Sequence, residues 1–88
     1  MITNIPAKYQ HLFADSNKYP NTKLIGILKN DDDSEMCFIC EKIDGNAHAY
    51  IFHNKKFYSH IYAAWCLTVD QIRRWEEKND GYTIWETA

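Results

Sequence analysis

Four short segments rich in β-branched and aromatic residues, separated by turn residues, constrain the fold of this chain more than any other feature. They cover residues 22–28, 36–43, 47–53 and 57–63. The third and fourth follow Asp44-Gly45-Asn46 and the turn-like 54–56, and Gly and Asn accept the positive φ of tight turns. Segment 36–43 begins with consecutive apolar residues, which is typical of a central strand covered on both faces. We therefore expect an antiparallel meander of four strands.

The residues before the meander show a helical period. Apolar side chains recur at the spacing of one helix face at Ile5, Tyr9, Leu12 and Phe13. Asn4 is suited to cap such a helix, and a proline is tolerated in its first turn. The spacing predicts an N-terminal helix from about residue 5 to residue 15.

The last quarter of the chain returns to the helical period. Thr68 and Gln71 fit a capping box, and Gly81 suits a left-handed C-terminal cap, so a second helix should end near Asn79. Its apolar arc contains Val69, Ile72 and Trp75, and its charged residues, Glu76 among them, should point to solvent. Segment 82–86 has strand composition. The sequence thus predicts one α+β domain over residues 1–88: helix, four-stranded antiparallel meander, helix and a short last strand.

Composition supports one folded core and disfavours general nucleic-acid binding. The 88 residues are 45% hydrophobic, with a formal net charge of −2. A binder of nucleic acid normally carries a basic excess to neutralise phosphates. Residues 31–44 instead hold six acidic side chains and one lysine. We therefore expect the partner to be a protein and not a nucleic acid.

Cysteine usage and hydropathy favour a soluble, cytoplasmic protein. Three cysteines make an odd count, which does not suggest a disulfide framework. The N-terminus lacks the uninterrupted apolar stretch of a secretory signal, and no apolar run approaches the roughly 20 residues of a membrane span. We therefore expect reduced thiols and no membrane.

A cysteine–histidine set offers a possible zinc site. Cys37, Cys40, His53 and His60 have a spacing close to that of a zinc finger. However, Cys37 and Cys40 fall inside a predicted strand, where side chains three apart point to opposite faces. We expect buried thiols and no cofactor, with zinc kept as an alternative.

An aromatic stripe offers a second alternative. By alternation, His48, Tyr50 and Phe52 share one face of a strand, and Tyr58, His60 and Tyr62 share one face of the next. Proteins that bind single-stranded nucleic acid stack bases on such platforms. Cross-strand aromatic pairs also stabilise sheets by themselves, and few lysines lie near the stripe.

No pattern supports an enzyme. Cys66 or Cys37 could act as a nucleophile with His60, His53 or His48 as its base. The chain has only three glycines and neither a phosphate loop nor a strained nucleophile turn. We expect no catalytic activity.

Protein recognition is the function that the sequence favours. Thirteen aromatic residues are more than a small core easily hides, and tyrosine and tryptophan dominate binding hot spots. The expected contacts are the acidic cluster, for a partner with a basic surface, and the exposed members of a tyrosine set: Asp31, Asp32, Asp33, Glu35, Tyr50, Tyr58 and Tyr62. In size and charge the chain resembles, in general kind only, phage-encoded inhibitors of host defence enzymes. That resemblance implies an inhibitor or adaptor acting by surface binding. Segment 82–86 could also leave an edge open for a homo-oligomer.

Overall fold

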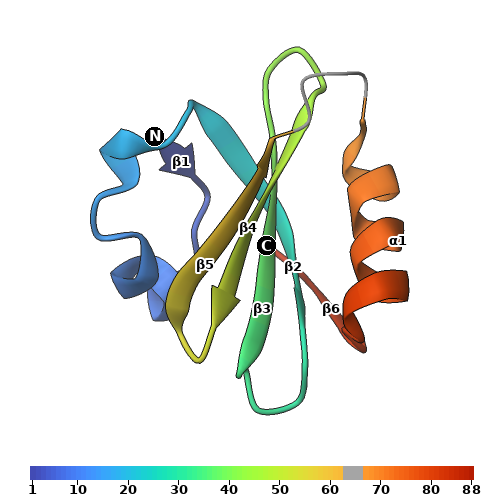
Figure 1. Cartoon of the computed structure of the whole chain (residues 1–88). Helices are drawn as coiled ribbons and strands as arrows, with labels where there is room; N and C mark the ends of the chain where they lie inside the picture. Colours follow the sequence, from blue (N-terminus) through green and yellow to red (C-terminus); the bar gives the residue numbers. More distant parts are fainter. Residues whose placement is uncertain (63–66) are drawn as a thin grey trace.

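A curled, half-barrel sheet of six strands forms the centre of the molecule in the computed structural model, which describes residues 1–62 and 67–88 (Figure 1). Four strands joined by hairpins pair antiparallel in chain order: β2 (Thr22–Lys29), β3 (Glu35–Glu41), β4 (Ala47–His53) and β5 (Lys56–Tyr62). Two short strands share the other edge of β2. β1 (Ile2–Thr3) runs parallel to the beginning of β2, and β6 (Ile84–Thr87) runs antiparallel to its end. The sheet is therefore mixed. β5 is an edge strand, and none of the described strands pairs with its outer side.

The predicted architecture of an N-terminal helix, a four-stranded meander, a C-terminal helix and a short last strand is wrong. The sheet has six strands, and two 3₁₀-helices, η1 (Ala7–Phe13) and η2 (Ser16–Lys18), replace the expected α-helix. Asn4, the residue expected to cap that helix, does not cap it. It adopts a φ of 69°, and its side-chain amide donates to the carbonyl of Leu24 at 3.1 Å. Pro6 precedes η1 without a side-chain cap, so this segment is held by packing.

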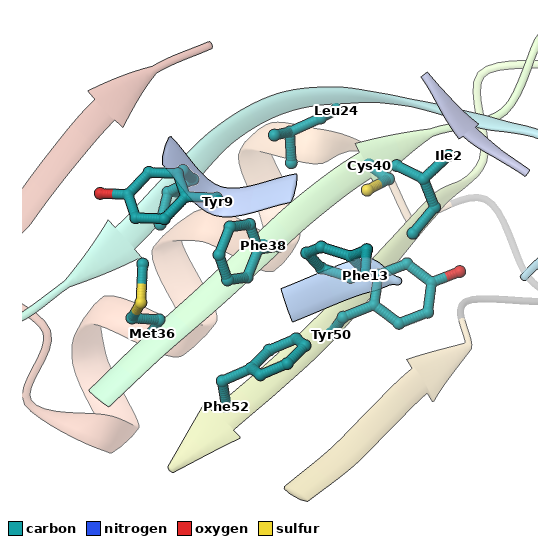
Figure 2. Close-up of a cluster of buried hydrophobic side chains, with 10 residues drawn as sticks. Ile2, Tyr9, Phe13, Leu24, Met36, Phe38, Cys40, Tyr50 and Phe52 are labelled. Atoms are coloured by element: carbon teal, nitrogen blue, oxygen red, sulfur yellow. The ribbon is translucent and has the colours of Figure 1, made fainter. Parts of the chain in front are cut away.

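The N-terminal segment covers one face of the sheet with aromatic rings. Figure 2 shows Tyr9 and Phe13 facing Phe38 of β3 and Tyr50 and Phe52 of β4. The ring of Phe13 meets Phe38 and Phe52 edge-on, with centroids 4.9 and 5.0 Å away. Edge-to-face pairs of this kind add about 0.5–1.5 kcal/mol each beyond the area that they bury. Tertiary packing therefore fixes a segment whose local helix signal is weak.

Helix α1 (Val69–Asp80) covers the other face (Figure 1). The predicted capping box of Thr68 and Gln71 is confirmed, and so is the left-handed cap at Gly81, with φ 72°. Of the predicted apolar arc, Ile72 is buried and Val69 packs against the core, but the predicted placements of Trp75 and Glu76 are wrong. Glu76 is 0% exposed on the sheet side, whereas Trp75 is 53% exposed. No helix among the described residues is long and apolar enough to cross a membrane.

Candidate functional site

A surface hollow of about 620 Å³ lies between β5 and α1. The helix packs chiefly on β2, β3 and β4, so the helix covers little of the side of β5 that faces it. Ile51 and Ile61 are half-buried in this hollow, and Tyr58 and Trp75 stand at its sides, 64% and 53% exposed. A second hollow of about 320 Å³ adjoins it through Ile61 and Trp75 and is bordered by Leu67. We call these two hollows together the β5–α1 groove.

A β-bulge in β5 and the position of one residue on α1 place the aromatic side chains at the groove. The pairing of β4 with β5 steps from Ile51–Ser59 to Phe52–Phe57, which leaves Tyr58 as the extra residue of a β-bulge. A bulge re-aims side chains, and Tyr58 here lines the helix side of the sheet. On α1, Trp75 follows Ile72 by three residues and lies toward the margin of the sheet instead of over its centre.

Glu35 and His53 close one end of the groove. Glu35 Oε2 lies 2.7 Å from His53 Nδ1, and the ring of Tyr58 meets the His53 ring with centroids 5.6 Å apart. The structure therefore brings together two of the predicted contact residues, Glu35 and Tyr58. The Glu35 carboxylate already has a partner within the chain.

The other acidic residues predicted to contact a partner lie in the turn between β2 and β3. The side chain and the backbone N–H of Ser34 bond to the Asp32 carboxylate and hold the pKa of Asp32 below its usual range. Asp33 has a φ of 60° and forms an ion pair of 3.2 Å with Lys29. Asp31 is exposed. Two of the three aspartates thus stabilise the hairpin, whereas Asp31 forms no ion pair with any residue that the structure describes.

The predicted aromatic platform is not on the surface. His48, Tyr50 and Phe52 do share one face, but they are at most 2% exposed, because the N-terminal segment covers them. The Tyr19 ring meets the Tyr50 ring edge-on, with centroids 5.0 Å apart. The bulge moves Tyr58 to the opposite face, and the Tyr62 side chain lies outside the described part of the structure. Tyr50 is therefore no surface contact, and the predicted rings do not form one exposed platform, although Tyr58 and His60 are exposed.

Two histidines on neighbouring strands form a close pair, with His48 buried and His60 exposed. His48 Nδ1 lies 2.8 Å from His60 Nε2, and the His60 ring stacks on Tyr50 with centroids 4.5 Å apart. Burial lowers the pKa of His48 to about 4, and the neighbouring His60 adds to that shift. Burial also lowers the pKa of His60. Near neutral pH the two rings are uncharged, and one ring nitrogen donates to the other.

The alternative zinc site is not assembled. Cys37 packs in the core under α1, whereas Cys40 packs in the core under the N-terminal segment. Both have 0% exposure, and burial raises the pKa of Cys40 to about 12. His53 and His60 point to different faces of the sheet. The described residues contain no group of three or more His, Cys, Asp or Glu placed to hold a metal ion.

The catalytic alternatives receive no geometric support from the described residues. Cys37 is fully buried and cannot reach a substrate from solvent. Cys66 lies outside the described residues. His48 and His60 bond to one another, and His53 bonds to Glu35.

Trp75 and Ile61 are groove residues that the sequence reasoning missed. The helical period assigned Trp75 to the buried arc. A different signal was present, because Gln71, Trp75 and Asn79 form an i, i+4, i+8 row in which tryptophan is the one apolar side chain. A lone tryptophan in a polar row indicates an exposed ring.

Comparison with protein families, with curated proteins and with solved structures finds no match for this chain. The chemistry of the groove follows from its own residues. Its floor is apolar, aromatic rings stand at its sides, and Glu35 is the carboxylate among its described lining residues. Such a surface can bury apolar side chains of another molecule.

Proposed function

We propose that this chain is a protein-interaction domain that acts by binding, as an inhibitor or adaptor, through the β5–α1 groove. One observation carries the proposal: Tyr58 and Trp75, 64% and 53% exposed, stand on opposite sides of a hollow with an apolar floor. Tyrosine and tryptophan anchor protein interfaces because they bury a large area at a small cost in side-chain entropy.

The distribution of exposed apolar side chains supports the same surface. Three of the six large hydrophobic side chains that are exposed among the described residues border the groove: Tyr58, Leu67 and Trp75. Scattered apolar residues are ordinary on a protein surface, whereas a contiguous set is typical of interaction sites. The groove therefore takes the place of the buried tyrosine stripe as the proposed contact surface.

Charge and cysteine chemistry extend the proposal. Asp31 and Asp32 are exposed beyond the Glu35 end of the groove and would meet a basic patch on a partner. Cys40 is a free and buried thiol, which is compatible with a reducing compartment. We accordingly assign the domain to the cytoplasm as part of this proposal.

Affinity capture with matched variants tests the proposal. The wild-type domain, the double variant Tyr58→Ala/Trp75→Ala and the control Ile43→Ala are used as baits in lysate of the native host, with and without nuclease. Ile43 is fully exposed and lies far along the chain from the groove residues, in the turn between β3 and β4. We expect a nuclease-resistant protein partner whose binding weakens at least about tenfold in the double variant, because hot-spot truncations typically cost 2 kcal/mol or more.

The thermal midpoints of all three baits should agree within a few degrees, since the substituted side chains are exposed. Equal capture by the double variant and the wild type would contradict the proposal. Loss of the captured material on nuclease treatment would also contradict it.

A further inference from the structure

β5 is an open edge of the sheet. It pairs with β4 on one side, and no strand or helix of the described residues pairs with its other side. At the opposite edge of the sheet, β1 pairs with the beginning of β2 and β6 pairs with its end. An unpaired row of backbone N–H and C=O groups is a ready template for another strand.

The second half of β5 lacks the usual protection of an edge. Natural edge strands are blocked by lysine, proline, inward-pointing charges or bulges. In β5 the bulge at Tyr58 and the single lysine, Lys56, both fall within the first three residues. Residues 59–62 then pair regularly with residues 51–48 and contain no Lys, Arg, Asp, Glu or Pro. Within the described part of the chain, this stretch can therefore accept a further strand.

We propose, building on the protein-interaction function above, that the groove receives an extended segment of a partner protein that adds to β5 as a further strand. A strand added there lies about 4.8 Å from β5, and its side chains alternate between the two faces of the sheet. On the helix side they meet Ile61 and the exposed ring of Trp75. On the other side they meet Phe57, which is 50% exposed. Both faces of the added strand thus contact apolar surface.

Charge identifies the chemistry at one end of that segment. Lys55 and Lys56 are exposed at the start of β5, and neither forms an ion pair with any described residue. Asn54 and Lys55 have φ values of 50° and 65°, which belong to the tight turn before the strand. The partner segment should carry an Asp or Glu beside these lysines. A second copy of β5 contains no acidic residue, so a partner protein fits this edge better than a second copy.

Selection from a displayed library of random twelve-residue peptides on the intact domain tests this inference. We expect enriched peptides with alternating apolar residues and an Asp or Glu near one end. Their affinity should fall at least tenfold for Ser59→Lys, which puts a charge on the groove face of β5. It should not change for Thr83→Lys, a control at an exposed position outside the groove. Lys56→Glu, a second exposed variant that spares the core, should shift the selected end residue from acidic to basic.

Amide hydrogen exchange of the peptide complex supplies the structural readout. Strand addition should slow exchange at alternate backbone amides within residues 57–62. Peptides that lose affinity with Trp75→Ala but not with Ser59→Lys, and leave β5 exchange unchanged, would overturn strand addition and leave the interaction function standing. Failure to enrich any peptide, or a dimer of the free domain that Ser59→Lys abolishes, would also overturn the inference.

Discussion

His48 and His60 are the residues whose charge is most closely tied to the fold. Their ring nitrogens lie 2.8 Å apart, and His48 has no solvent exposure. A proton placed on His48 must be accommodated without water and beside a second imidazole. Lys42 also opposes that proton, while Asp44 favours it.

Acid should therefore destabilise the fold through His48. Because its pKa is about 4 in the folded state and about 6.5 when unfolded, the unfolded chain binds more protons between these values. Stability is fully present above pH 6.5 and is lost as the pH falls toward 4, by on the order of 2 kcal/mol between pH 7 and pH 4.5. Urea unfolding across this range measures the loss.

The matched variants are His48→Gln and His11→Gln, since His11 is exposed on η1. The first should remove most of the slope between pH 6.5 and pH 4.5, and the second should retain it. An unchanged slope in His48→Gln would show that other groups cause the acid sensitivity.

Gly26 is a second position where one residue controls packing. A Cβ at this position would lie 2.2 Å from the ring of Trp85, so the ring occupies the space that any side chain needs. Gly26→Ala should lower the free energy of unfolding by about 1–3 kcal/mol, the usual cost of overpacking. A double-mutant cycle with Trp85→Leu measures the coupling. If Gly26→Ala costs as much in the Trp85→Leu background, the ring is not the cause.

At the scale of elements, Glu86 connects three parts of the fold. Its carboxylate on β6 accepts from Lys8 of η1 at 2.7 Å and pairs with Lys29 of β2 at 3.0 Å. The hydrogen bond from Lys8, followed by that from Lys29, lowers the pKa of Glu86. These ion pairs connect η1 and β6 to β2.

Glu86→Gln should destabilise the domain by about 1 kcal/mol at pH 7, a modest value because the network is partly exposed. A carboxyl group with a lowered pKa stabilises above its unfolded pKa and loses that effect as the pH falls through the folded pKa. The difference between variant and wild type should therefore close in acid. Chemical denaturation at pH 7 and pH 3 tests this, with Glu77→Gln on α1 as the control, and a constant difference would contradict it.

The elements also show how far local sequence signals reach. The ends of α1 follow from side chains that bond to neighbouring backbone, so Thr68, Gln71 and Gly81 are readable from sequence. The N-terminal segment depends on where Tyr9 and Phe13 pack, and its local period suggested the wrong helix. Bulges at Ile25 and Tyr58 leave no clear local signal, yet each changes which residues face which side of the sheet.

At the scale of the whole molecule, the candidate site comes from the mismatch between a short helix and a wide sheet. α1 has 12 residues and covers the middle of a six-stranded sheet, so the helix side of β5 keeps its apolar residues near solvent. The sequence predicted Glu35 and Tyr58 as contacts, and both line this groove. It could not predict that Tyr50 is buried, because that depends on how the N-terminal segment covers the sheet, whereas the exposure of Trp75 had a signal in the polar row of α1.

The most direct test of the account is hydrogen–deuterium exchange of the domain with and without the protein partner isolated by capture. We predict slower exchange in residues 57–62 of β5 and residues 71–79 of α1, with the N-terminal segment unchanged. Protection in the acidic turn at residues 31–34 or in residues 1–20, with β5 and α1 unaffected, would contradict it.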